Sequence, residues 1–179
     1  MILTDREIQL AIYSGQIEIT PKSDDDAYSA TSLDLTLSEP GEVWNVLAGQ
    51  PIRPGTRGYS YSQLASRKTQ IASLHNHTMR QNAFVLAWAR ETISLPITSR
   101  FAARVEGKSG LARLGLIVHL TAPTIHAGFK GQIQLEMVNL GPNDIILDVG
   151  MPICQLIFEM TLGTPVQGYA GGYFGQTQP

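Results

Sequence analysis

Residues 125–139 decide the fold, and they read IHAGFKGQIQLEMVN. Gly128 and Gly131 bracket a turn, after which apolar and polar side chains alternate. This alternation is typical of a half-buried β-strand, with three apolar side chains on one face and three polar ones on the other, Glu136 among them. The pattern alone favours simple solvent exposure of the polar face over a catalytic role for Glu136.

The segments on either side of this strand predict an all-β protein. Gly and Pro separate short apolar or alternating runs, which predict strands at residues 32–37, 83–89, 91–95, 101–106, 116–121, 132–139, 144–149 and 153–159. Strands at this spacing favour a barrel or a jelly-roll-like pair of sheets. Thr4 and Glu7 form a capping box that predicts a short helix over residues 5–14, ending at Gly15. Residues 45–82 are predicted to be irregular, with one or two short strands.

Length and composition limit the possible classes of protein. A chain of 179 residues fits a single domain spanning 1–179. The net charge of −2 argues against a protein that grips nucleic acid through its phosphates. Cys154 is the only cysteine, so the chain forms no internal disulfide and no Cys-rich zinc site. There is no long apolar run and no signal-peptide pattern, so we expect a cytoplasmic protein without a membrane partner.

A second segment, residues 106–116, reads EGKSGLARLGL. It combines two cations, a hydroxyl group and flexible backbone, and such a stretch can hold a polyphosphate through main-chain N–H groups and side-chain charge. By itself the pattern is more often a solvated loop.

Taken in chain order, residues 106–116 and then 125–139, the two segments resemble the dCTP deaminase branch of the dUTPase-like superfamily. Residues 107–116 match the family signature G-[KR]-S-S-L-A-R-L-G-L, except that Gly110 replaces the second serine. Residues 118–122, VHLTA, are similar to the family's V-H-V-T-A strand, and Glu136 lies where the family keeps its catalytic glutamate. The similarity extends over nearly the whole chain apart from residues 40–80, and it includes residues 30–35, 150–156 and 173–176.

The resemblance implies a dUTPase-like distorted jelly roll or β-barrel that forms a homotrimer, with active sites at the subunit interfaces. It implies hydrolysis of dCTP to dUTP and ammonia, with Mg²⁺ bound to the triphosphate. It also implies no catalytic zinc, and a single cysteine cannot supply the H-x-E…P-C-x-x-C arrangement of zinc deaminases. Glu136 is then the general acid and base, Ser109 holds the water or the tetrahedral centre, and Arg113 stabilises charge and orients Glu136.

The same resemblance predicts the residues that bind substrate. Phosphate contacts are expected from Lys108 and the neighbouring Gly110, Leu111 and Ala112, and base contacts from the main chain of Gln134 and Leu135. Tyr169 and Gln176 would close over the nucleotide from a flexible C-terminal flap, residues 168–179, which could equally be a disordered terminus. The remaining predicted contacts are Ala122, His126 and His119, the last of which is at least as well explained as a core histidine.

Besides Gly110, the chain departs from the family pattern at three positions. His126 replaces an aspartate that helps activate water in dUTPases, which lowers the expectation of diphosphatase activity. Thr124 and Gly172 replace basic residues, a loss that Lys130 or Arg104 could offset. The alternative functions are a bifunctional deaminase–diphosphatase, a dUTP or dCTP diphosphatase, a nucleotide-binding regulator without activity, and a structural jelly roll. A metal pair at His75 and His77, or a cation at residues 24–26, is less expected than simple solvation.

Overall fold

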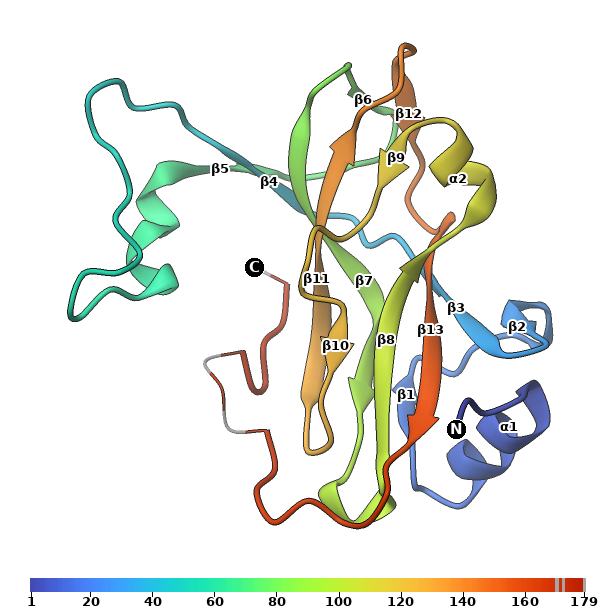
Figure 1. The fold of residues 1–179 in the computed structure, drawn as a ribbon. Helices are drawn as coiled ribbons and strands as arrows, with labels where there is room; N and C mark the ends of the chain where they lie inside the picture. Colours follow the sequence, from blue (N-terminus) through green and yellow to red (C-terminus); the bar gives the residue numbers. More distant parts are fainter. Residues whose placement is uncertain (170, 172, 179) are drawn as a thin grey trace.

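The computed structural model describes residues 1–169, 171 and 173–178. Its strands form two main sheets and one small one, and every strand pairing among these residues is antiparallel (Figure 1). The first sheet has the order β5 (Lys68–Ile71), β4 (Gly41–Trp44), β7 (Phe84–Ser94), β11 (Lys130–Asn139) and β9 (Leu116–Ile117), and β1 (Glu18–Thr20) also pairs with β7. The second has the order β10 (Thr124–Ile125), β8 (Phe101–Gly107), β13 (Pro152–Met160), β3 (Ser32–Thr36) and β2 (Tyr28–Ser29). The small sheet pairs β12 (Ile145–Leu147) with β6 (His77–Met79). The all-β prediction is confirmed.

Helices are short and lie outside the sheets. They are α1 (Asp5–Tyr13), α2 (Ser109–Arg113) and the 3₁₀ helices η1 (Asp25–Ala27), η2 (Tyr61–Arg67) and η3 (Ile97–Ser99). The predicted N-terminal helix is α1, and the predicted capping box of Thr4 and Glu7 is formed. The hydrogen bond from Thr4 lowers the pKa of the Glu7 carboxyl. In the described parts of the chain, no helix combines the length and apolar character needed to cross a membrane.

The core lies between the two main sheets, and the alternation of β11 decides which side chains enter it. Leu135 and Met137 are fully buried in the core, whereas Gln134 and Glu136 are half-buried on the opposite face. The other strands supply a matching set of apolar side chains, which includes Leu33, Leu35, Val85, Ala87, Ala89, Val105, Leu156 and Phe158. Core packing therefore directs Glu136 away from the interior.

Two strand predictions need correction. Residues 83–89 and 91–95 form the single strand β7, which continues through the exposed Arg90 at the apparent break. The adjacent Glu91 is a buried carboxylate that accepts hydrogen bonds from the Thr36 amide and hydroxyl. The strand predicted over residues 116–121 ends at Ile117, although Val118 is still buried. Within residues 45–82, β5 and β6 are the two short strands expected. The sequence patterns missed β1, β2, β4 and β10, each of which has only two to four residues.

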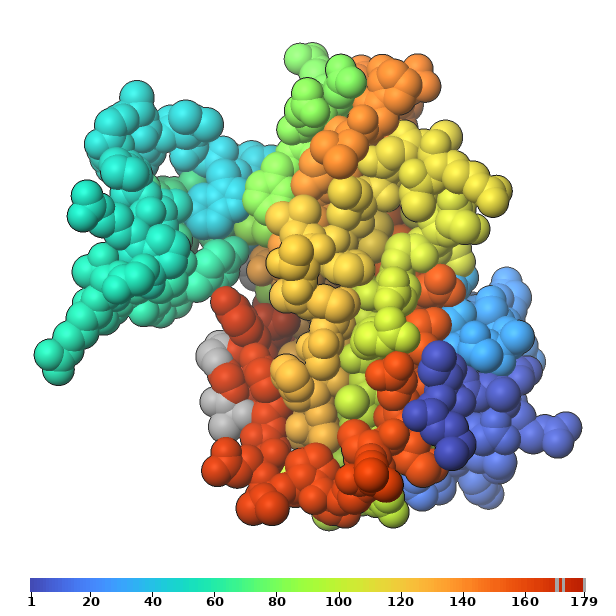
Figure 2. Space-filling model, in the orientation of Figure 1, coloured from blue at the N-terminus to red at the C-terminus, as the bar shows by residue number. Residues whose placement is uncertain are grey.

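Two segments outside the sheets matter for the site. Residues 45–67, here called the arm, leave the β4–β5 hairpin and project from the body of the molecule (Figure 2). The described residues from 168 to 178 (168, 169, 171 and 173–178), here called the tail, come after β13 and return alongside β11 (Figure 1). The tail is attached there by main-chain hydrogen bonds from Gly175 to Lys130 (2.7 Å) and from Gln132 to Gln176 (2.9 Å).

Candidate active site

A cavity of about 490 Å³ lies on the non-core face of β7 and β11. Its volume falls in the range typical of small-molecule sites. The wall is mainly apolar and aromatic, and the carboxylate of Glu136 is the one acidic group among the described lining residues. The lining is formed by Trp44, Tyr61, Phe84, Leu86, Val105, His119, Ala122, Thr124, Ile125, His126, Phe129, Ile133, Gln134, Leu135, Glu136, Tyr169, Tyr173 and Gln176.

The position of Glu136 follows from strand register. Glu136 is directly opposite Leu86 on β7, and Val138 is opposite Phe84. Side chains at paired positions project from the same face of a sheet, so Leu86 lies beside the Glu136 carboxylate in the cavity wall. The carboxylate is therefore half-buried next to apolar surface, at a point that a ligand can reach.

The main chain of β11 offers hydrogen-bonding groups at the same place. In the described chain, β9 pairs only with Val138 and Asn139 along one edge of β11, and the tail attaches to that edge at Gln132. The Asn139 amide donates to Ala83 on the β7 side, and main-chain groups alternate direction along a strand. The amides and carbonyls of Gln134 and Glu136 therefore point to the edge between β9 and the tail, where they can pair with a flat heterocycle.

Two glycines, one in the turn before β11 and one at the start of β11, allow the tail to approach closely. Gly128 has φ +88°, and a Cβ placed on it would lie 2.7 Å from the Tyr169 amide nitrogen. A Cβ on Gly131 would lie 2.8 Å from the Gln176 carbonyl oxygen. The tail also bonds through the Gln176 side-chain amide, which donates to the Gln132 carbonyl (2.8 Å). Both glycines thus permit a backbone approach that any side chain would block.

Aromatic rings cover the end of the cavity that the tail reaches. Tyr169 stacks on His126, with ring centroids 5.8 Å apart and planes 13° apart. Phe129 packs on the same tyrosine at 5.8 Å in a tilted arrangement. His126, the residue that replaces the family aspartate, therefore meets the tail by ring stacking.

The cavity brings together eight of the predicted site residues, and the other six lie elsewhere. The eight are His119, Ala122, His126, Gln134, Leu135, Glu136, Tyr169 and Gln176. Residues 108–113, which include the remaining six, form the start and body of α2 and do not line it. Ser109, Gly110, Ala112 and Arg113 are exposed there, Leu111 is half-buried, and Lys108 is ion-paired with Asp34 of β3.

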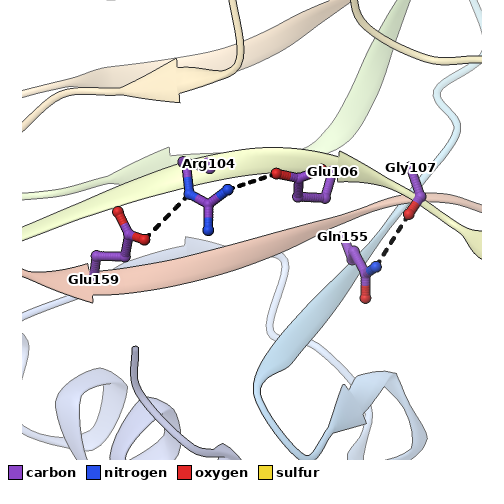
Figure 3. A network of polar contacts seen from close by, with 5 residues as sticks. All are labelled: Arg104, Glu106, Gly107, Gln155 and Glu159. Carbon is purple, nitrogen blue, oxygen red and sulfur yellow. Dashed lines mark hydrogen bonds and ion pairs between the residues drawn. The ribbon is translucent and has the colours of Figure 1, made fainter. Parts of the chain in front are cut away.

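A polar network along β8 and β13 holds the main chain in place just before α2 begins (Figure 3). The Gln155 side-chain amide donates to the Gly107 carbonyl (3.1 Å), immediately before Lys108. Further along, Arg104 bonds Glu106 (2.7 Å) and Glu159 (3.2 Å). Two carboxylates thus engage Arg104, so this arginine is a poor replacement for a missing phosphate contact. Lys130 is exposed, and the Gly172 position lies outside the described residues.

The remaining histidines and acidic residues of the described structure are relevant to ligand and metal binding. The Nδ1 atom of His119, in the cavity wall, is buried and has no hydrogen-bond partner among the described residues. His75 lies 3.7 Å from Asp148, with both side chains largely exposed. The described residues contain no group of three or more His, Cys, Asp or Glu side chains placed to hold a metal ion. Mg²⁺ commonly binds substrate phosphates and keeps several waters, so a cation carried by a nucleotide requires no such group.

Several cavity residues were not predicted. Phe129 and Ile133 stand in the segment that decides the fold, but their apolar character suggested only packing. Tyr173 is part of the tail motif, and its aromatic ring was the available signal. Trp44, Tyr61, Phe84 and Leu86 come from β4, the arm and β7, and no local pattern links them to Glu136.

A family model described as dCTP deaminase-like matches residues 2–161. A protein of Rhodospirillum rubrum named dCTP deaminase is 34% identical over 176 residues, which cover 95% of this chain and 88% of that protein. A protein of Tropheryma whipplei named "dCTP deaminase, dUMP-forming" is 36% identical over 186 residues, covering 100% of this chain and 90% of that protein.

Solved structures resemble the fold. The 2'-deoxycytidine 5'-triphosphate deaminase of Agrobacterium tumefaciens superimposes with a TM-score of 0.68 at 20% identity, covering 89% of this chain. The match spans 48% of that structure's chain, about half its length. A dUTPase of Staphylococcus bacteriophage 80alpha gives a TM-score of 0.50 at 10% identity, over 87% of this chain and 96% of that one. The predicted dUTPase-like fold is confirmed.

Proposed function

Because the chain belongs to the dCTP deaminase-like family, we propose that it hydrolyses dCTP to dUTP and ammonia. The observation that carries this proposal is the half-buried carboxylate of Glu136 beside the open main-chain edge of β11, inside one cavity. A cytosine ring placed against that edge meets a carbonyl that can accept from its 4-amino group and an amide that can donate to N3 or O2. This contact positions C4 close to the Glu136 side chain.

Glu136 then acts as both base and acid. It takes a proton from a water molecule as the oxygen attacks C4, and it delivers that proton to N3. The tetrahedral hydroxyl loses its proton as the amino group gains one, so ammonia leaves and a C4 carbonyl remains. The tail keeps bulk water away from this centre by closing Tyr169 and Gln176 over the cavity. His119 also lines the cavity and would be a further contact for the ligand.

Ser109 and Arg113 reach the reaction in this proposal from a second copy of the chain. Within one chain, α2 and the cavity are separate, and most of α2 is exposed. If α2 of one copy meets the cavity of the next, the contact is head-to-tail and can close into a ring, here a homotrimer. Ser109 would hold the attacking water, Arg113 would orient Glu136, and the main chain at Gly110, Leu111 and Ala112 would bind phosphate beside Lys108.

Mg²⁺ would enter with the triphosphate and neutralise part of its charge. The single thiol, Cys154, is buried, which is compatible with the reducing cytoplasm where we place the enzyme.

Replacement of Glu136 by Gln tests the proposal. The amide keeps the shape of the side chain but cannot take up a proton, so ammonia release from dCTP should fall by about 10²–10⁴-fold. Binding of dCTP, followed by calorimetry, should be nearly unchanged. Deamination close to the wild-type rate would remove Glu136 from the mechanism. Binding of dCTP by the wild type without any turnover would indicate a regulator instead.

A second candidate reaction also releases pyrophosphate and yields dUMP. The name of the Tropheryma whipplei relative favours it, while a histidine at position 126, in place of the family aspartate, disfavours it. Ion-exchange separation of products from dCTP distinguishes the two, because only the second reaction converts the triphosphate to a monophosphate.

A further inference from the structure

The arm places an aromatic side chain on the cavity, far in sequence from the tail. The arm leaves the β4–β5 hairpin after Trp44 and rejoins it at Lys68, and these two residues are paired in the sheet register. Just before the chain rejoins β5, η2 begins at Tyr61, which lines the cavity together with Trp44. The arm therefore leaves and rejoins the sheet at paired positions, and its C-terminal part lies at the cavity.

Three contacts fix Tyr61. Its ring packs edge-on against Trp44, with centroids 6.1 Å apart. The ammonium of Lys68 lies 5.1 Å from the ring centroid, and Lys68 is itself held by a buried ion pair with Glu42. On the other side, Tyr61 packs edge-on against Tyr173 of the tail, at 6.2 Å.

We propose that Tyr61 is a positioning residue that holds the tail closed over the bound nucleotide through its contact with Tyr173. The arm and the tail then form two halves of one lid, joined by this pair of rings. The inference rests on the proposed function, because it assigns the closed tail a part in binding dCTP. Tyr61 itself takes no part in proton transfer.

The surroundings of Tyr61 suit a packing role. Burial raises its pKa to about 12, and the nearby Glu42, Tyr173 and Glu136 contribute. The phenol therefore keeps its proton at any working pH, and a neutral ring packs against its partner without a desolvation penalty for charge. The pKa of Tyr173 is raised as well, chiefly by burial.

Kinetics of Tyr61→Ala provide the first test. Loss of the ring pair should raise KM for dCTP by about two- to tenfold with little change in kcat, as expected for an aromatic contact that aids binding but not chemistry. Tyr61→Phe keeps the ring and should restore most of the wild-type KM. Val46→Ala is the control, because Val46 belongs to the arm, is almost fully exposed and does not line the cavity. In Tyr61→Ala/Tyr173→Ala, KM should rise no further than in the single variants.

Proteolysis without nucleotide provides the second test and does not depend on activity. Of the three arginines of the arm, Arg53 precedes Pro54 and Arg67 directly precedes β5, so trypsin can cut in the middle of the arm mainly after Arg57, four residues before Tyr61. If the rings hold the arm to the tail, Tyr173→Ala should speed cleavage after Arg57 by about two- to tenfold, although position 173 lies far along the chain.

The two tests separate the possible failures. A purely local structural role for Tyr61 would leave cleavage after Arg57 unaffected by Tyr173→Ala, and this result, or a wild-type KM in Tyr61→Ala, overturns the inference. If the wild type fails to deaminate dCTP, the proposed function falls, while faster cleavage in Tyr173→Ala still supports the contact between arm and tail.

Discussion

Replacement of Gly131 by Ala should open the tail. The new Cβ would lie 2.8 Å from the Gln176 carbonyl oxygen and 3.1 Å from its amide nitrogen, which are backbone atoms that can move only with the tail. The shift would break the two hydrogen bonds that join Gln176 to Gln132, of 2.9 and 2.8 Å. Each is worth about 0.5–1.5 kcal/mol, so closure should weaken by about 1–3 kcal/mol, or about 5- to 150-fold.

Two measurements check this value. KM for dCTP should rise by up to that factor, and chymotrypsin should cut after Tyr173 faster than in the wild type. Gly55→Ala is the matched control, since a Cβ there meets no atom within 4 Å. Gly131 has φ +153°, so the melting temperature of the variant must also be measured to separate backbone strain from loss of the tail contact. An unchanged KM together with unchanged cleavage would refute the assignment of the tail as a substrate lid.

Two other predictions concern assembly and stability. Co-expressed Glu136→Gln and Arg113→Ala chains should recover about one quarter of the wild-type sites, because mixed copies can pair an intact glutamate with an intact arginine; an inactive mixture would place both groups in one chain. Burial raises the pKa of the Cys154 thiol. The folded protein therefore keeps this proton at pH values where the unfolded chain loses it, so the free energy of unfolding falls above about pH 8.5 by up to about 1.4 kcal/mol per pH unit. Thermal unfolding from about pH 7 to about pH 10 should therefore show a flatter decline in Cys154→Ala, and parallel declines would contradict the reasoning.

The sequence predicted the strands correctly where the alternation of apolar and polar residues reflects which side chains are buried. Alternation in residues 132–139 correctly separated Leu135 and Met137, which enter the core, from Glu136, which does not. It failed at residue 90, because an exposed arginine within one long strand cannot be told from a break between two strands by pattern alone. Very short strands such as β9 have too few residues to show a period at all.

The site was predictable only in part, for two reasons. The tail was predicted as either a flap or a disordered terminus, and its Tyr169 and Gln176 line the cavity. Trp44 and Tyr61 reach the cavity through the register of β4 and the course of the arm, which no local pattern records. The signature residues Ser109 and Arg113 were expected beside Glu136, yet a single chain does not bring them there. The arrangement proposed above requires contacts between copies, and such contacts leave little trace in the sequence of one chain.

The arm also gives the molecule a lopsided charge distribution. It carries three of the thirteen cationic residues and none of the fifteen acidic ones, so the rest of the chain has a net charge of −5 against an overall −2. A positive projection on a negative body is an electric dipole, and such a dipole would turn approaching copies so that the arm of one faces the body of another. At low ionic strength encounters should be faster and better oriented, and physiological salt, with a screening length of about 8 Å, should remove most of this steering.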